Sequence, residues 1–118
     1  MLMWNQEDVF GVAHDPVSCS SVDTGLYAAF KEIGNIGAVF CGHDHGNDYW
    51  GEYKGIKLFF GRKTGYGGYM PPWYWAQQRG ARVIEFSVDI TNIADPNKAP
   101  IVNMTSWIRE ETGNIIKQ

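Results

Sequence analysis

An apolar run near the middle of the chain constrains the fold more than any other feature of the sequence. Residues 36–41 are apolar or small throughout, which is typical of a β-strand covered on both faces. Residues 23–33, which precede this run, have the spacing of an amphipathic helix, and its apolar positions are Leu26, Ala29, Phe30 and Ile33. A helix followed by a buried strand is half of a β-α-β unit. The sequence therefore predicts an α/β (α+β) fold with a mixed sheet and one main helix.

Both ends of the expected helix carry capping signals. Ser21 or Asp23 offers a side-chain oxygen that can accept backbone N–H groups of the first turn. Gly34 tolerates the left-handed backbone that commonly ends a helix. We therefore expect a helix that begins near Asp23 and ends before Gly34.

The chemistry of the chain is concentrated directly after the apolar run, in Gly42-His43-Asp44-His45-Gly46-Asn47-Asp48. Two of the three histidines of the chain lie here, separated by one residue. In open α/β sheets, ligands bind beyond the carboxyl ends of the strands, and imidazole is a common ligand of zinc and iron. His43 and His45 are therefore candidate metal ligands. The alternative is a polar pair at the strand end, hydrogen-bonded to the backbone.

The rest of the chain predicts further strands and one long loop. Residues 48–53 and 56–60 flank Lys54-Gly55, which has the composition of a tight hairpin turn. Alternating residues predict strands at 82–88 and 101–109. The loop 61–80 is rich in glycine and aromatic residues, so its rings either cover a substrate entrance or anchor the loop on the core.

Size and composition limit the classes of function. The chain has 118 residues, enough for one domain or part of one, and a formal net charge of −3. It lacks the clustered lysines and arginines that nucleic acids and anionic membranes attract, so we expect neither as a partner. No apolar stretch approaches the ~20 residues of a membrane span, and the first residues lack a signal-peptide pattern. We expect a soluble chain whose compartment is open, with Cys41 as a buried free thiol.

These motifs resemble a known family. Gly42-His43-Asp44-His45 after an apolar strand resembles the last metal-binding motif of calcineurin-like metallophosphoesterases, and its continuation to Tyr49 resembles the branch similar to purple acid phosphatases. Further segments resemble that branch in family order, namely residues 18–27, 51–58, 61–69 and 79–85. The resemblance implies that residues 1–118 form one partial domain, the C-terminal half of an αββα sandwich.

The resemblance also implies a function for the histidines. In this family, two metal ions, which could be iron, zinc or manganese, activate water for attack on a phosphate ester. By motif, His43 would bind the second metal and His45 the first. Asp44 and Asp48 would orient the imidazole rings or turn the loop, and the alternative for both is a solvated loop acid.

The chain departs from the family pattern in its other ligands. It contains no Asp-x-His, no Gly-Asp and no Asn-His, so we expect the site to need an N-terminal half or another copy of the chain. His14 is a weak candidate for a missing ligand, because a lone loop histidine is more often exposed. Arg62 and Lys63 either contact a phosphate or are solvated. Whether this chain is itself an enzyme stays open, and the alternative is a non-catalytic binding or assembly module.

Overall fold

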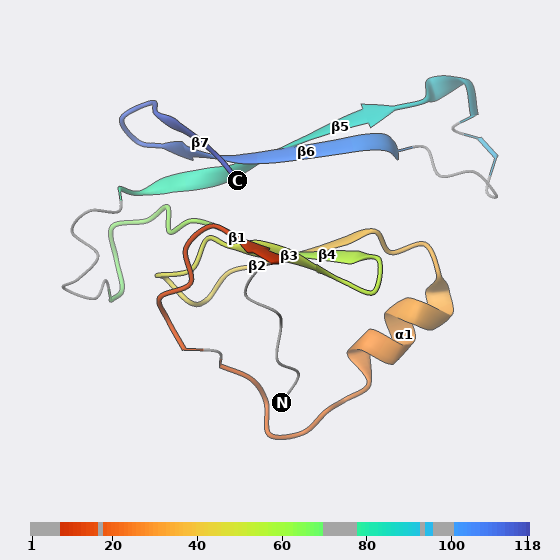
Figure 1. Ribbon diagram of the computed structural model, residues 1–118, viewed down its shortest axis with the longest axis horizontal. Coiled ribbons are helices and arrows are strands. Elements are labelled where there is room, and N and C mark those ends of the chain that lie inside the picture. The colour runs from red at the N-terminus through yellow and green to blue at the C-terminus, as the bar shows by residue number, and fades with distance from the viewer. Residues whose placement is uncertain (1–7, 17, 70–77, 93, 96–100) are drawn as a thin grey trace.

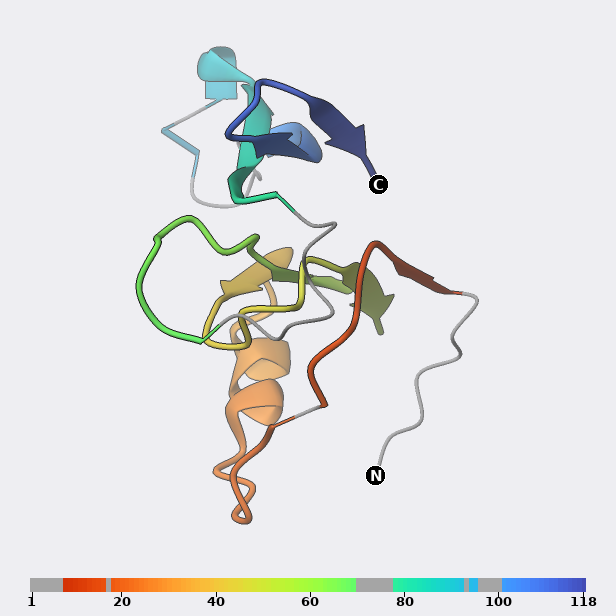
Figure 2. The same ribbon diagram turned by 90° about the vertical axis from the view of Figure 1, so that its left-hand side faces the viewer.

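Two β-sheets lie face to face, and one helix lies on the outer side of the larger sheet (Figures 1 and 2). The computed structural model describes residues 8–16, 18–69, 78–92, 94–95 and 101–118. Its elements are β1 (Val9–Phe10), α1 (Leu26–Ile33), β2 (Ala38–Cys41), β3 (Trp50–Tyr53), β4 (Ile56–Phe60), β5 (Gly80–Val88), the 3-10 helix η3 (Ile90–Asn92), β6 (Ile101–Glu110) and β7 (Ile115–Lys117). This arrangement confirms the mixed α/β class predicted from the sequence.

The larger sheet has the strand order β1-β3-β4-β2. Only the β2–β4 pair is parallel, so the sheet is mixed. The hairpin between β3 and β4 turns at Lys54 (φ 48°) and Gly55 (φ 84°), as the sequence predicts, because left-handed backbone at both positions matches the twist of the strands.

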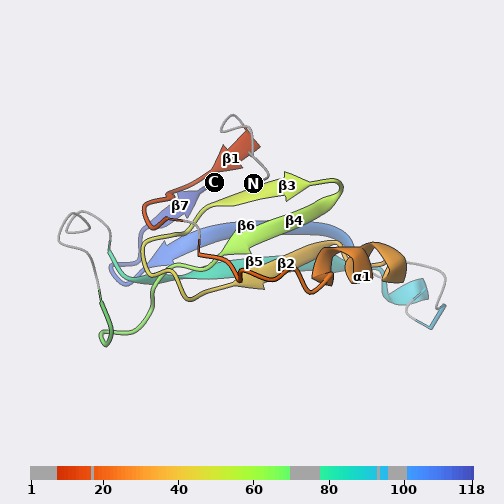
Figure 3. The ribbon, with the colours of Figure 1, turned by 90° about the horizontal axis from the view of Figure 1, so that it is seen from below.

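The smaller sheet is antiparallel, in the order β5-β6-β7. Figure 3 shows β5 and β6 extending behind the strands of the larger sheet. The buried apolar residues are Ile56 and Phe59 from the larger sheet and Ile108 from the smaller one. The third strand, β7, was not predicted, since Ile115–Lys117 is too short to show a period.

Helix α1 begins later than the sequence suggests. Its N-cap is Gly25 (φ 77°), and no side chain caps it. The Asp23 carboxylate instead accepts the Gly25 backbone N–H at 2.8 Å, which forms a local turn before the helix. The expected cap by Ser21 or Asp23 is therefore wrong, whereas Gly34 (φ 79°) ends the helix as predicted.

The expected burial of the apolar run is also wrong. Phe40 in β2 is 39% exposed, Cys41 is exposed rather than buried, and Leu26 and Ile33 on the apolar side of α1 are 59% and 60% exposed. The periodic pattern of the sequence shows which side chains are apolar, but these side chains are buried only where another part of the protein packs against them. Within the described residues no such part covers these side chains.

The loop predicted over residues 61–80 is described at residues 61–69 and 78–79, and β5 begins at Gly80. The expected roles of Trp73, Tyr74 and Trp75 fall outside the described residues. No helix in the part of the chain that is described is long and apolar enough to cross a membrane.

Candidate functional site

The histidine loop, residues 42–48, leaves the carboxyl end of β2 and leads toward β3. His43 has a φ of 88°, a conformation that residues other than glycine rarely adopt. The loop then turns through a bond from the Asn47 N–H to the Asp44 carbonyl at 3.3 Å. His43 is exposed and His45 half-buried, so the loop presents one ring to solvent and packs the other.

The ring of His45 is held in a defined orientation by the neighbouring loop. Its Nδ1 lies 2.6 Å from the Tyr69 carbonyl oxygen, and the two rings stack with centroids 4.3 Å apart. A carbonyl only accepts hydrogen bonds, so Nδ1 carries the proton of the neutral ring and Nε2 keeps its lone pair. This is the tautomer and the kind of backbone contact that orient a metal-binding imidazole.

Glycine at position 68 is required by this packing. A Cβ built on Gly68 would lie 2.6 Å from Cε1 of His45, and its φ is +75°. The Lys63 ammonium donates to the Gly67 carbonyl and closes the same loop. The segment from Lys63 to Tyr69 is therefore a cradle for the His45 ring.

Tyr69 also connects the histidine loop to the N-terminal segment. Its hydroxyl donates to the Asp15 carboxylate at 3.0 Å, and the same carboxylate accepts the Gly46 N–H at 2.8 Å. The His45 backbone N–H donates to this hydroxyl and lowers its pKa, but burial and the Asp15 carboxylate outweigh it, so the pKa of Tyr69 lies above its ordinary value. The hydroxyl is accordingly a proton donor at neutral pH.

Asn47 fixes the segment that contains His14. Its side chain is buried, and Oδ1 accepts the backbone N–H groups of His14 at 2.9 Å and Asp15 at 3.0 Å. Its Nδ2 donates to the carboxylate of Asp44, which is itself buried, at 3.5 Å. The structure thus places His14 beside the histidine loop with its side chain exposed, and its weak candidacy as a metal ligand stays untested.

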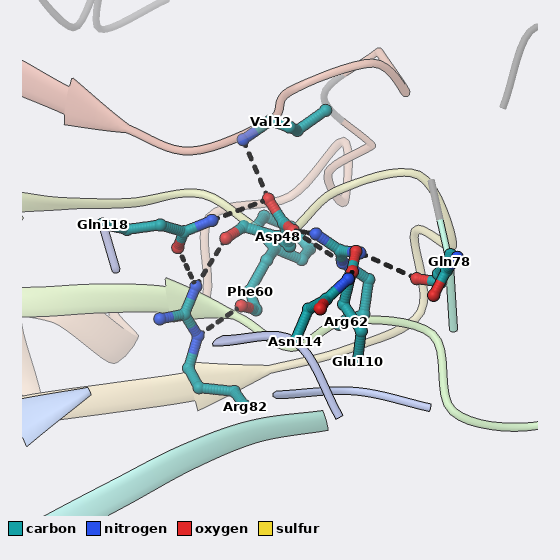
Figure 4. A network of polar contacts seen from close by, with 9 residues as sticks. All are labelled: Val12, Asp48, Phe60, Arg62, Gln78, Arg82, Glu110, Asn114 and Gln118. Atoms are coloured by element: carbon teal, nitrogen blue, oxygen red, sulfur yellow. Dashed lines mark hydrogen bonds and ion pairs between the residues drawn. The ribbon is translucent and has the colours of Figure 1, made fainter. Parts of the chain in front are cut away.

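Asp48 lies in a buried ion pair (Figure 4). Its carboxylate is fully buried, accepts the Arg62 Nε–H at 2.7 Å and also contacts Arg62 Nη2. The Val12 N–H donates to the other oxygen at 2.8 Å, and Gln118 Nε2 donates to it at 3.0 Å. Asp48 is therefore a structural anchor in this chain rather than the solvated loop acid of the alternative.

Two arginines extend this hydrogen-bond network from the histidine loop and the larger sheet to the smaller sheet. Arg62 is 7% exposed and also donates to the Gln78 carbonyl at 2.7 Å and to Glu110 at 3.1 Å, so it is neither solvated nor directed at a phosphate. Arg82 in β5 donates to the Phe60 carbonyl at 2.8 Å, as Figure 4 shows, and to Ser106 at 2.8 Å. Burial lowers the pKa of Arg82. An arginine at the start of a mostly apolar strand was the sequence signal for this role, and it was missed.

The residues brought together fit part of a metal site. His45 presents a lone pair, and His43 lies two residues away on an exposed, strained backbone. Within the described residues, no three side chains of His, Cys, Asp or Glu gather in a way that could hold a metal ion. Because zinc and similar ions take four or more ligands, the two imidazoles would at most supply one side of such a site.

Comparisons with known proteins agree with the motif. No family model and no solved structure matches the chain. Curated relatives from Arabidopsis thaliana do match. The chain is 42% identical over 76 residues to "Probable inactive purple acid phosphatase 28", 31% over 99 residues to "Probable inactive purple acid phosphatase 29", and 33% over 84 residues to "Probable inactive purple acid phosphatase 14".

These matches cover 64%, 84% and 71% of this chain but only 18%, 24% and 20% of the respective relatives. The chain thus spans less than a quarter of the curated relatives that it matches. Over most of its own length, this chain is therefore related to the purple acid phosphatases.

Proposed function

We propose that this chain supplies one side of a two-metal site for phosphate ester hydrolysis, with His43 and His45 as its ligands. The observation that carries the proposal is the His45 ring, whose Nδ1–H is bonded to the Tyr69 carbonyl and whose Nε2 lone pair is thereby available. The relationship to purple acid phosphatases supports it. The matched relatives are named probable inactive, so the proposal concerns the ligands and not turnover by this chain alone.

Each residue of the site would have a separate task. His45, held by Tyr69 and Gly68, would bind one ion of iron, zinc or manganese, and His43 would bind the other. Bound ions would supply the positive charge that stabilises phosphoryl oxygens and lowers the pKa of water. Asp44 would hold the loop through Asn47, and Asp48 through Arg62. The remaining ligands would come from a longer parent chain, a separate N-terminal half or a second copy.

The proposal is tested by metal titration of the purified chain. We expect zinc or manganese to bind weakly and to shift the His45 ring resonances. Binding should weaken in His43→Ala and in His45→Ala, each of which removes one imidazole ligand, and it should persist in Lys54→Gln, a change in the exposed hairpin turn, as the control. Binding should also weaken as pH falls, because only neutral imidazole is a ligand. Unchanged affinity in His45→Ala would overturn the proposal.

Turnover provides a second test. We expect the chain alone to leave para-nitrophenyl phosphate intact, since two imidazoles are short of a coordination shell. Full loading with two metals together with phosphatase turnover would contradict the idea that the site is incomplete.

A non-catalytic assembly module is the second candidate. The observation in its favour is the exposure of Leu26 and Ile33, which form an apolar side on α1. We expect sedimentation at rising concentration to show self-association that Leu26→Ser with Ile33→Ser abolishes. A monomer at all concentrations would count against this role.

A further inference from the structure

A cavity of about 480 Å³ lies between the two sheets, and Gln118, which donates to Asp48 of the histidine loop, is among the residues that line it. Trp50, Lys57 and Phe59 line it from the larger sheet, and Met104, Trp107 and Lys117 line it from the smaller one. Cavities of roughly 300–1,000 Å³ with aromatic walls and a few polar groups are typical small-molecule sites. We propose that this cavity binds a small aromatic anion, a planar ring that carries a carboxylate or sulfonate.

The aromatic wall of the cavity, Trp50 and Phe59, is the middle of a continuous row of rings across the larger sheet. Phe10, Trp50, Phe59 and Phe40 are register partners on β1, β3, β4 and β2. Their ring centroids are 5.0, 5.4 and 4.8 Å apart in that order, and each neighbouring pair is stacked. Rings that support one another in this way form a rigid apolar surface, which favours a flat and equally rigid ligand.

The opposite wall suits the same ligand. Met104 has an unbranched, polarizable side chain that adapts to an aromatic edge. Ser106 also lines the cavity, and its oxygen accepts a bond from Arg82 at 2.8 Å, so its hydroxyl proton remains available to donate. The two sheets thus offer apolar surface with a hydrogen-bond donor at one point.

Two ammonium groups give the cavity its preference for an anion. Lys57 Nζ lies 5.7 Å from the centre of the Trp50 ring, and Lys117 approaches from β7. Among the described residues neither lysine is in an ion pair, although Glu52 is the register partner of Lys57. A negative group on the ligand would therefore meet two cations at the edge of an aromatic wall, the half-buried Lys57 and the exposed Lys117, so its attraction to them should be screened by salt.

Binding is measured with naphthalene-1-sulfonate as the probe, followed by quenching of tryptophan fluorescence. We expect saturable binding that weakens with added salt. The uncharged 1-naphthalenemethanol should bind less tightly and show no salt dependence. Saturable binding of the sulfonate that is no tighter than that of the alcohol would overturn the charge assignment, and absence of saturable binding would overturn the site.

Variants locate the binding. Met104→Trp should fill the cavity and abolish binding of both probes. Lys57→Gln with Lys117→Gln changes one half-buried and one exposed side chain, so the fold should persist, and sulfonate affinity should fall about fivefold while that of the alcohol stays constant. Lys54→Gln in the hairpin turn is the matched control and should change neither. Equal sulfonate affinity in the double lysine variant and the native chain would contradict the proposal. Metal titration is independent of these results, because no histidine lines the cavity.

Discussion

The two ends of the histidine loop differ in how they are held. At one end, His43 is exposed and its backbone is in a left-handed conformation that costs free energy. At the other end, Asn47 and Asp48 are buried and bonded to the N-terminal segment, to Arg62 and to Gln118. The bonds of Asn47 and Asp48 therefore hold the loop in a shape that keeps the His43 backbone strained.

This difference separates chemistry from structure within one motif. Residues that hold a fold are buried and have partners, whereas residues that bind a ligand need an open coordination position. By that criterion Asp48 belongs to the fold, and the Nε2 atom of His45 belongs to the proposed site. The two ends can therefore be disrupted separately by substitution.

Breaking the anchor should have the largest effect. Asp48→Asn keeps the shape of the side chain but removes one of the two carboxylates paired with the buried Arg62 guanidinium, the other being Glu110. We expect the free energy of unfolding to fall by about 2–4 kcal/mol, measured by urea denaturation, because Glu110 compensates the buried charge only in part.

The exposed Glu85 on β5 provides the control for this change. Glu85→Gln should change the free energy of unfolding by no more than about 0.5 kcal/mol. A loss below 1 kcal/mol in Asp48→Asn would show that the ion pair does not anchor the loop.

Breaking the cradle should cost less stability but should move the histidine. In Gly68→Ala the new methyl meets Cε1 of His45 at 2.6 Å, and alanine is strained at a φ of +75°. We expect a loss of about 1–2 kcal/mol and a shift of the His45 ring resonances in NMR spectra.

Gly67→Ala is the matched control, because nothing lies within 4 Å of its Cβ position. Its His45 resonances should stay in place. If both variants gave the same spectrum, the cradle would not orient the ring.

Relieving the strain at the other end should stabilise the chain. His43→Gly removes the side chain that makes a φ of 88° unfavourable. We expect the free energy of unfolding to rise by about 1 kcal/mol while metal affinity falls. His14→Gly, at a residue without positive φ, should give no such gain. A destabilised His43→Gly variant would mean that the ring contributes packing rather than strain.

Local signals in the sequence predicted much of this architecture. The Lys54-Gly55 turn set the β3–β4 register, and Gly34 ended the helix, because each depends on the backbone preference of one or two residues. The burial of β2 was predicted wrongly, since burial depends on surfaces distant in sequence.

Of the candidate site, only the sequence motif could be recognised in advance, and its long-range contacts could not. Gly-His-Asp-His located the two candidate ligands, but nothing in their spacing showed that Tyr69 would hold His45 or that Arg62 would pair with Asp48. Those contacts join residues 24 and 14 positions apart, and they arise only when the sheets are assembled. Long-range polar partners are chosen by tertiary structure, so no local period encodes them.

The smallest expected effect concerns two tyrosines whose pKa values are raised for different reasons. Burial is the main cause at Tyr49, which follows the anchor Asp48, with further contributions from Cys41 and Asp44. At the exposed Tyr66 the main cause is its hydrogen bond to Glu111, at 2.9 Å. A raised pKa means that the folded state retains the proton longer. The stabilisation is therefore present below the ordinary tyrosine pKa of about 10 and is lost as pH rises through the raised value.

Carbon-13 NMR titration of labelled tyrosines separates the two causes. Glu111→Gln should return the pKa of Tyr66 toward its ordinary value, because it removes both the charge and the carboxylate acceptor. Asp44→Asn should lower the pKa of Tyr49 only slightly, because burial beside Phe60 remains, with ring centroids 5.0 Å apart. If Asp44→Asn returned the pKa of Tyr49 fully to its ordinary value, the Asp44 charge and not burial would be the main cause of the shift. The two ends of the loop would then differ in charge rather than in burial.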